Sequence, residues 1–416
     1  MSDIFAERRT RFYELMEDRS VLILFTGSAP QRSGDQDYAY TPDRNTYYLT
    51  GVDTPLLVFC ASKLGGKVTE QWFIPRPEKR HEIFYGHMET EEEASERLGC
   101  QASYHDRFEP FLDGLFTANH MEKVWLDLER RALSEPSGQA NVLARRLAKA
   151  HPYLQFVNAG AVIGDIRRVK EPGELDLMRE AIRITGLGIE SILEHMGPGV
   201  NEREIQAWFE FTIKTNGASD NAFAPIVAGG ANSISLHYGT NNCDLADGDL
   251  LLVDLGAEYG YYNGDITRTF PVNGKFTEEQ RYFYETVLEA QAAVIRTVKP
   301  GMHITETTKI AQETMFERCR ARGIAESMDD MKRLLPHGVS HYLGLDTHDS
   351  GERTELQPGM VITVEPGIYI PELGIGIRIE DDVVITEDGC EVLSPQIIKQ
   401  PDEIEAYMAE HNVFLR

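Results

Sequence analysis

The chain has 416 residues, more than one ordinary hydrophobic core accommodates, because domains usually hold about 100–200 residues each. Hydrophobic residues make up 42% and charged residues 26%, which is the composition of a globular protein rather than a disordered one. With 41 basic and 67 acidic residues the net charge is −26, which argues against nucleic acid and anionic membrane surfaces as partners.

The cysteines and the N-terminus bear on the cellular compartment. Five cysteines lie far apart and form no CxxC pair, which argues against a disulfide framework and against a zinc–thiolate site. The first residues, MSDIFAERRTRFYELM, contain no apolar signal core, and no apolar run approaches the ~20 residues needed to span a bilayer. These features predict a cytoplasmic protein.

The first part of the chain predicts an α/β unit. Short apolar runs predict strands at Ser20–Phe25, Leu56–Ala61 and Gln71–Ile74. Helices are expected at Glu91–Leu98, which is acidic, and at Ala140–Ala150, which presents a face of arginine and lysine.

A boundary between two domains is predicted near residue 165. The sequence Val169-Lys-Glu-Pro-Gly is rich in turn formers, and Pro172 suits the first turn of a helix. An apolar stripe at helical spacing follows. We therefore expect one domain over residues 1–164 and a second over residues 165–416.

The second part of the chain alternates helices with buried strands. An apolar stripe at helical spacing runs from Phe283 to Val294, and Pro300-Gly301 ends this helix. Three apolar runs predict strands at Leu250–Leu255, Val361–Glu365 and Ile377–Thr386. All three carry carboxylates at or near their ends, which calls for an explanation.

Four carboxylates lie in or beside these strands: Asp254, Asp265, Glu365 and Glu380. Burying a lone carboxylate costs several kcal/mol unless it is paired or bound to a cation. Arg378 is a candidate partner for Glu380, because residues two apart on a strand share a face, but one arginine cannot neutralise four carboxylates. One or two divalent metal ions could neutralise them.

A histidine cluster lies between these carboxylates in the sequence. His337, His341 and His348 fall within twelve residues, and His237 adds a fourth histidine earlier in the chain. Imidazole suits both metal binding and proton transfer near neutral pH. A site of mostly carboxylates with one imidazole is hard, so it favours Mn²⁺, with Co²⁺, Fe²⁺ or Zn²⁺ as substitutes. Two such ions could activate a water molecule and hold a substrate carbonyl.

At these residues the sequence resembles the M24 metallopeptidases, in the branch that contains aminopeptidase P and prolidase. The matching stretches occur in the family's order and begin at Asp254, Gly264, His337, Thr363 and Gly376. Nearer the N-terminus, Phe5-Ala-Glu-Arg-Arg, Asp37-Tyr-Ala-Tyr and Tyr47-Tyr-Leu-Thr-Gly-Val resemble the creatinase-like domain of aminopeptidase P. The resemblance implies an α/β (α+β) fold, with a creatinase-like domain at 1–164 and a pita-bread catalytic domain at 165–416.

The resemblance also implies a metal site. Carried over by position, the family's metal ligands fall on Asp254, Asp265, His341, Glu365 and Glu380. Asp265 and Glu380 would bridge two metals. Asp254 would complete the coordination of one metal, and His341 and Glu365 that of the other.

Further active-site residues follow from the same resemblance. His237 and His348 match histidines that line the family's active site, where one would hold the substrate carbonyl and the other the peptide chain, and Glu365 would carry the proton. The family's substrate pocket falls on His337, Tyr369, Arg378 and Phe223. Two positions depart from the family pattern. Phe84 stands where relatives carry a tryptophan that reaches a neighbouring subunit, and Arg353 is a candidate for an arginine expected after His348.

The implied function is that of a Xaa-Pro aminopeptidase with two metals, which releases the first residue from peptides whose second residue is proline. Prolidase, which cleaves only dipeptides ending in proline, shares this metal site and is the first alternative. A non-catalytic pita-bread binding protein is the second alternative. It predicts the loss of metal ligands, whereas all five residue types are present here. The family also implies a homodimer or homotetramer.

Overall fold

The computed structural model describes residues 2–130, 132, 134–351 and 354–415. The chain divides into two compact units, Met1–Ile166 and Arg167–Arg416. Within the described residues, no helix is both long and apolar enough to cross a bilayer.

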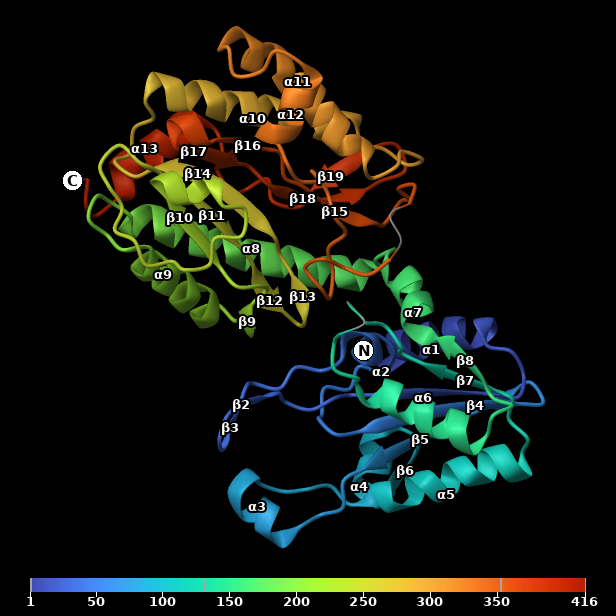
Figure 1. The fold of residues 1–416 in the computed structure, drawn as a ribbon. Helices are drawn as coiled ribbons and strands as arrows, with labels where there is room; N and C mark the ends of the chain where they lie inside the picture. Colours follow the sequence, from blue (N-terminus) through green and yellow to red (C-terminus); the bar gives the residue numbers. More distant parts are fainter. Residues whose placement is uncertain (1, 131, 133, 352–353, 416) are drawn as a thin grey trace. The chain divides into compact units, whose positions relative to one another are not determined.

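The first unit is built on a mixed sheet of six strands in the order β6-β5-β4-β1-β7-β8 (Figure 1). The strands are β1 (Ser20–Phe25), β4 (Val58–Leu64), β5 (Lys67–Ile74), β6 (Gln101–Tyr104), β7 (Lys123–Leu126) and β8 (Gln155–Asn158). The central strand β1 pairs antiparallel with β4 and parallel with β7. Five of its six residues are buried, because both faces of a central strand are covered in an α/β unit.

Helices and a short hairpin complete this unit. The helices are α1 (Ser2–Leu15), α2 (Arg44–Thr50), α3 (Lys79–Tyr85), α4 (Glu91–Leu98), α5 (Phe108–Asp113), α6 (Gln139–Ala150) and α7 (Ala159–Arg167), and the hairpin pairs β2 (Gln31–Ser33) with β3 (Gln36–Asp37). The predicted strand at Leu56–Ala61 is wrong at its start. Leu56 has φ of 65°, a left-handed turn conformation that no strand residue adopts, so β4 begins at Val58.

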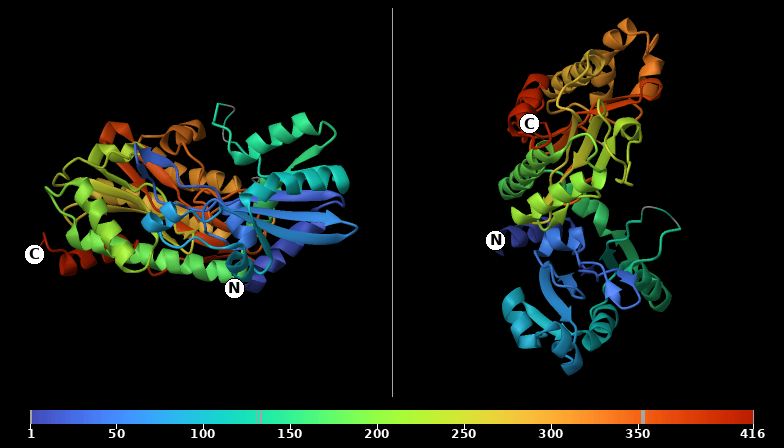
Figure 2. Two further views of the ribbon diagram at one scale, coloured as in Figure 1. Left: turned by 90° about the horizontal axis from the view of Figure 1, so that it is seen from below. Right: turned by 90° about the vertical axis from the view of Figure 1, so that its left-hand side faces the viewer.

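In the second unit, two helix pairs lie on opposite sides of the strands (Figures 1 and 2). One pair is α8 (Pro172–His195) with α9 (Glu202–Thr215), and the other is α10 (Glu278–Thr297) with α11 (Glu306–Ala321). The remaining helices are α12 (Met328–Leu334) and α13 (Pro401–His411).

The strands of the second unit form small antiparallel sheets. The bounds are β9 (Asp220–Asn221), β10 (Ile226–Gly229), β11 (Leu250–Leu255), β12 (Ala257–Tyr259), β13 (Tyr262–Asn263), β14 (Ile266–Pro271), β15 (Val361–Val364), β16 (Gly367–Ile370), β17 (Ile375–Arg378), β18 (Asp381–Ile385) and β19 (Cys390–Val392). They pair in the orders β10-β11-β14, β13-β12-β9, β15-β18-β19 and β16-β17.

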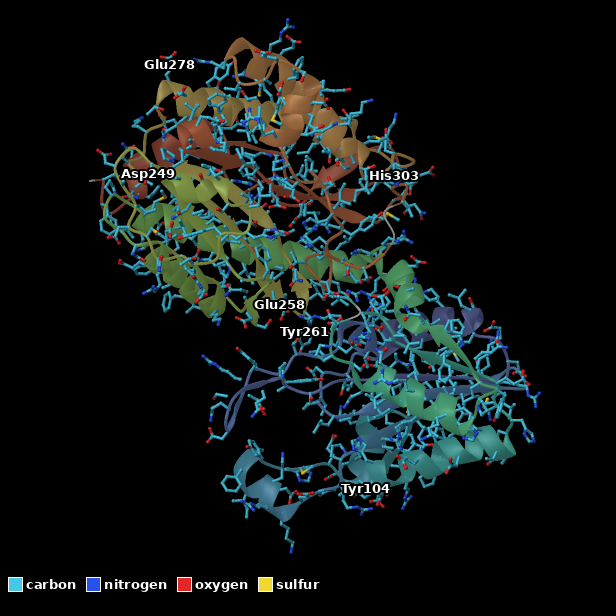
Figure 3. The ribbon with its side chains drawn as sticks, in the orientation of Figure 1. Tyr104, Asp249, Glu258, Tyr261, Glu278 and His303 are labelled. Carbon is cyan, nitrogen blue, oxygen red and sulfur yellow. The ribbon has the colours of Figure 1, made fainter. Side chains whose placement is uncertain are left out.

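The helix predicted from its apolar stripe is confirmed as α10. Phe283, Val287 and Val294 are each at most 1% exposed, and Thr277 begins the helix with a capping box. Glu278, labelled in Figure 3, is exposed in its first turn, so one face packs inward and the other meets solvent.

The single strand predicted over Ile377–Thr386 is wrong, because the structure forms two strands there. β17 pairs with β16, whereas β18 pairs with β15, so the chain passes from one sheet to another at Ile379 and Glu380. Glu380 therefore lies in the break between two strands and not inside one.

Candidate metal centre

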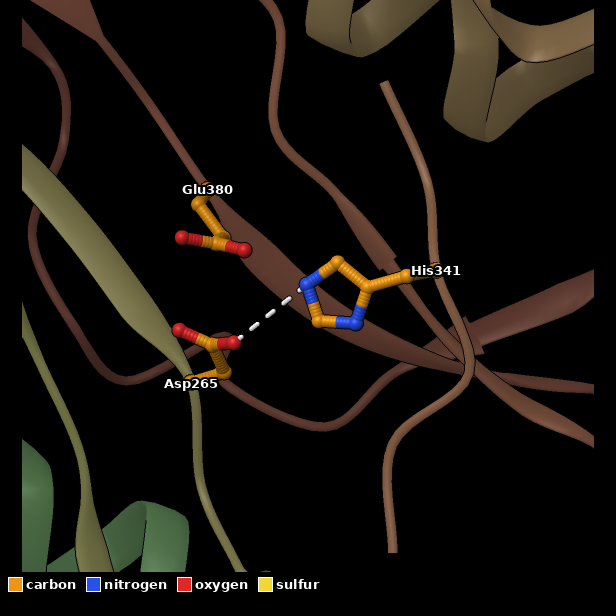
Figure 4. Close-up of side chains that lie close together, drawn as sticks. All are labelled: Asp265, His341 and Glu380. Atoms are coloured by element: carbon orange, nitrogen blue, oxygen red, sulfur yellow. Dashed lines mark ion pairs between the residues drawn. The ribbon is translucent and has the colours of Figure 1, made fainter. Parts of the chain in front are cut away.

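Three side chains from separate segments of the second unit converge on one point (Figure 4). Asp265 precedes β14, His341 follows α12, and Glu380 lies between β17 and β18. One potential ligand atom from each lies within 4.8 Å of the other two, and His341 Nε2 is 3.5 Å from Asp265 Oδ2. Asp265 and Glu380 are 4% and 2% exposed, so the acidic oxygens are withdrawn from water.

Hydrogen bonds fix the backbone at the two buried carboxylates. The Asp265 amide donates to Asp382 Oδ2 over 3.0 Å, and the Glu380 amide donates to the Thr267 carbonyl over 3.0 Å. The Thr267 hydroxyl also donates to Glu380 Oε2 over 2.6 Å. β14 and the β17–β18 break are thereby held in a fixed relation, which sets the two carboxylates opposite each other.

The imidazole of His341 is oriented by bonds on its far side. Its Nδ1 lies 3.0 Å from the Tyr342 carbonyl, and its amide donates to Thr363 Oγ1 over 3.1 Å. A bond from Nδ1–H to a carbonyl places the lone pair of the neutral ring on Nε2, which is the state that a metal ligand needs. This Nε2 is the atom that faces Asp265.

The other two predicted ligands lie at the edge of this group. Glu365 follows β15, and its Oε1 is 3.6 Å from His341 Nε2. Asp254 is the fifth residue of β11 and pairs in register with Thr267 of β14. Its Oδ1 is buried and has no hydrogen bond from any residue that the structure describes.

The electrostatics of the site call for positive charge. Burial, reinforced by the neighbouring carboxylates, raises the pKa of both Asp265 and Glu380 well above their ordinary values. Burial likewise raises the pKa of Glu365 to about 8. A bound cation would favour the charged carboxylates and so lower these raised pKa values. Asp254 Oδ1, which has no hydrogen-bond partner among the described residues, would offer the cation a further ligand. The donor set of four carboxylates and one imidazole therefore fits divalent metal ions.

Arg378 neutralises part of the cluster, but its partner is not the expected one. Its Nη2 donates to Asp254 Oδ2 over 2.7 Å, whereas the sequence suggested Glu380. Its Nε donates to the Thr267 hydroxyl over 3.0 Å, and its Nη1 donates to the Tyr369 hydroxyl over 2.8 Å. The strand is interrupted at Ile379 and Glu380, so the Glu380 side chain does not lie on the same face as that of Arg378. The Thr267 hydroxyl links the two side chains, because it bonds to both.

His337 joins this network from the histidine cluster. Its Nε2 lies 3.0 Å from the Tyr369 hydroxyl and its Nδ1 lies 3.6 Å from Glu365 Oε2. Burial, aided by the charge of Arg378 and by nearby His237, lowers the pKa of His337 to about 4. The imidazole is therefore neutral at physiological pH.

The remaining predicted residues lie around this core. The ring centroid of His348 is 4.2 Å from that of His341, and both His348 and His237 are exposed. Phe223 is half-buried on the loop between β9 and β10. Phe84 is 70% exposed on α3, and Arg353 lies outside the described residues.

Sequence reasoning missed residues that support the ligands. Arg268 is fully buried on β14, donates to the Glu380 carbonyl and pairs with Asp381 Oδ1 over 2.8 Å. A visible signal was an arginine in the otherwise uncharged run Ile266–Pro271. Thr267 and Asp382 offered no such signal, since their roles depend on partners more than a hundred residues away.

Comparisons with known proteins give one consistent result. The model of metallopeptidase family M24 matches residues 176–387, and the model of the N-terminal domain of aminopeptidase P matches residues 5–125. The chain is 34% identical to Xaa-Pro aminopeptidase of Escherichia coli strain K12 over 435 residues, with 97% of each chain covered.

Solved structures agree with this match. A Bacillus anthracis protein assigned to aminopeptidase P is 39% identical, with a TM-score of 0.96 over 99% of both chains. Zinc-substituted Escherichia coli aminopeptidase P in complex with product is 33% identical, with a TM-score of 0.90 over 99% of both chains.

Proposed function

The chain belongs to metallopeptidase family M24, and from this premise we propose that it is a Xaa-Pro aminopeptidase. It releases the N-terminal residue from peptides that carry proline in second position. Its fold joins an N-terminal domain of the aminopeptidase P type to a pita-bread catalytic domain, as the sequence motifs predict.

The observation that carries this proposal is the convergence of Asp265, His341 and Glu380 in a chain of this family. A binding protein on the same fold has no need to gather carboxylates whose pKa is raised by burial and by neighbouring carboxylates. A metallopeptidase does need them, because they hold its metals.

Asp254, Asp265, His341, Glu365 and Glu380 would hold two divalent ions. When bound, these ions supply Lewis-acid activation of water and of the scissile carbonyl. We propose Mn²⁺ as the native metal, with Co²⁺, Fe²⁺ or Zn²⁺ as substitutes. A zinc-substituted relative supports such substitution. We further propose a cytoplasmic homodimer or homotetramer.

The protein's own side chains would move the proton and bind the substrate. Glu365 would take a proton from the attacking water and deliver it to the prolyl nitrogen that leaves. His237 and His348 would hold the substrate carbonyl and the peptide chain, since both are exposed to incoming ligand. Neutral His337 can accept a hydrogen bond or donate one without adding charge beside Glu365.

Recognition of proline would rest on shape. A prolyl nitrogen in a peptide bond carries no N–H, so the site cannot select proline by accepting a hydrogen bond from it. His337 and Tyr369, joined at 3.0 Å and buttressed by Arg378, offer a pre-organised wall for the ring. Phe223 would add an aromatic surface to the substrate pocket.

The test is a peptide panel with the purified full-length protein, assayed with and without added Mn²⁺. The panel contains Xaa-Pro-Xaa tripeptides, the dipeptide Gly-Pro and tripeptides with alanine in place of proline. Metal-dependent release of the first residue from the proline tripeptides is expected. Turnover of the dipeptide alone would identify a prolidase instead. A protein that binds no metal and stays inactive after Mn²⁺ is added would be a binding module.

A further inference from the structure

Glu202, in the first turn of α9, is fully buried and accepts four hydrogen bonds from one loop. Its Oε1 accepts from the Gly229 amide over 2.8 Å and from Asn232 Nδ2 over 2.9 Å. Its Oε2 accepts from the Tyr238 hydroxyl and from the Cys243 amide, each over 2.9 Å. Both oxygens are thus saturated by donors, so burial leaves neither oxygen of Glu202 without hydrogen-bond partners.

These four donors enclose the segment that carries His237. Gly229 ends β10, Asn232 lies in the short helix η3 (Gly230–Ile234), and Cys243 closes the loop. Tyr238 immediately follows His237. One carboxylate therefore ties together the start, the middle and the end of the loop, and it holds the neighbour of the histidine directly.

The same loop is fixed on its other side to the strand that carries Arg378. The Gly376 amide of β17 donates to Ser233 Oγ over 3.0 Å. A Cβ on Gly376 would lie only 2.2 Å from the Ser233 carbonyl oxygen, so the two backbones touch and only glycine fits. The loop is clamped between α9 and β17, with an exposed His237 at its surface.

We propose that Glu202 is a positioning residue for catalysis, which acts by holding His237 in place through Tyr238 and the loop backbone. This inference rests on the proposed function, because it assigns His237 to binding of the substrate. Because His237 is exposed, its location depends on the backbone that carries it. A displacement of the order of 1 Å is enough to lower turnover about a hundredfold.

Two conservative variants test the role. Glu202→Gln keeps the size but replaces one acceptor oxygen with an NH₂ group, which cannot accept from either donor on that side. Tyr238→Phe removes one hydroxyl and leaves the carboxylate and its other three bonds intact. We expect kcat to fall ~10–100-fold in Glu202→Gln and less in Tyr238→Phe, with KM within about threefold of wild type.

A matched pair elsewhere in the unit serves as control. The Tyr407 hydroxyl of α13 donates to Glu194 Oε1 of α8 over 3.1 Å, another bond between a tyrosine and a helix carboxylate. Glu194→Gln and Tyr407→Phe should leave kcat unchanged. If the role of Glu202 is merely structural, all four variants should lower thermal stability and leave kcat per folded molecule intact.

A double mutant decides whether Glu202 acts through His237. If it does, Glu202→Gln combined with His237→Ala is no slower than His237→Ala alone. Losses that multiply in the double mutant would overturn the inference, as would full kcat in both single variants. Should Glu202→Gln fail to fold, the same cycle with Tyr238→Phe gives the answer.

Hydrogen exchange separates this inference from the proposed function. Glu202→Gln should speed amide exchange over residues 229–243, whereas Glu194→Gln should not. Unchanged exchange there would overturn the anchoring role whatever the enzyme cleaves. A wild-type protein that cleaves no proline peptide would overturn the proposed function, even where exchange reports an anchored loop.

Discussion

At the scale of single residues, the site depends on carboxylates whose burial and closeness to one another disfavour their charged forms. Asp265 and Glu380 lie within one ligand group, and burial with mutual repulsion raises the pKa of each. Asp265→Asn keeps the shape but withdraws one negative charge. We expect metal content to fall by at least one ion per chain and kcat/KM to fall more than ~100-fold.

Elemental analysis together with the proline tripeptide assay measures both effects. Asp388→Asn, on the β18–β19 turn, is a suitable control, because it changes a carboxylate outside the ligand group. Full activity in Asp265→Asn would contradict the assignment of this residue to the metals.

Thr267 supports the metal ligands, and its removal should change metal affinity. Its hydroxyl accepts from Arg378 Nε and donates to Glu380 Oε2, so it orients a ligand and a substrate-pocket residue together. Thr267→Val keeps the volume and removes both bonds. Metal affinity should fall ~10–100-fold, as is usual when an outer partner of a ligand is lost.

Metal titration of Thr267→Val against Thr307→Val isolates this effect. Thr307 is equally buried, but its hydroxyl donates only to the Ile304 carbonyl within its own turn. Equal metal affinity in wild type and Thr267→Val would show that the hydroxyl does not orient Glu380.

At the scale of elements, the loop from His341 to Asp349 is held by a buried charge cluster. Asp349 accepts from Arg167 Nη2 over 2.5 Å and from Lys170 Nζ over 2.9 Å. Its Oδ2 would lie only 2.3 Å from a Cβ on Gly344, so loop and carboxylate pack in direct contact. The cluster fixes the loop to the segment that leads into α8.

This cluster gives the protein a predictable response to acid. Burial alone would raise the pKa of Asp349, but Lys170 and Arg167 outweigh it and hold that pKa below its ordinary value of 3.8. The folded state therefore binds fewer protons than the unfolded state below that value. The stabilisation is fully present above about pH 5, and it is lost progressively as the pH falls below 3.8 and through the lower pKa of the folded state.

Asp349→Asn should therefore destabilise the protein by ~3–5 kcal/mol at pH 7, because buried Lys170 and Arg167 each lose a charged carboxylate partner, although Arg167 keeps Asp346 at 2.7 Å. The difference from wild type should narrow as the pH approaches 3. Urea unfolding of both proteins at several pH values measures it. Asp402→Asn, which breaks an exposed pair with Arg281, should change little at any pH. A gap between wild type and Asp349→Asn that is independent of pH would rule out the linkage.

At the scale of the whole molecule, the predicted metal ligands all belong to the unit Arg167–Arg416. Metal binding should therefore stabilise that unit. A ligand present at a hundred times its Kd adds ~2.7 kcal/mol, which corresponds to about 5–10 °C in Tm for a unit of this size. Chelation should remove this increment and added Mn²⁺ should restore it.

Calorimetry of the full chain measures the shift, and Asp265→Asn provides the control that should respond less to Mn²⁺. The same titration with Co²⁺ and Zn²⁺ ranks the candidate metals. A Tm that responds to neither chelator nor metal would contradict metal binding in the folded protein.

The sequence by itself determined several of the elements and indicated the chemistry of the site. Leu250–Leu255 and the stripe from Phe283 to Val294 carry their own periodicity, so β11 and α10 follow from local pattern. Asp254, Asp265 and Glu380 predicted a cation, because carboxylates in or beside apolar runs need a counter-charge when they are buried. The resemblance to family motifs then indicated which positions would be the metal ligands.

Only the tertiary structure decided which groups meet. Glu380 lies between two strands because β17 and β18 belong to different sheets, and Arg378 consequently pairs with Asp254. Glu202 collects donors from positions 27 to 41 residues further along the chain. Such pairings form when segments that are distant in the sequence come together in the fold, and the local sequence pattern does not show which segments will meet.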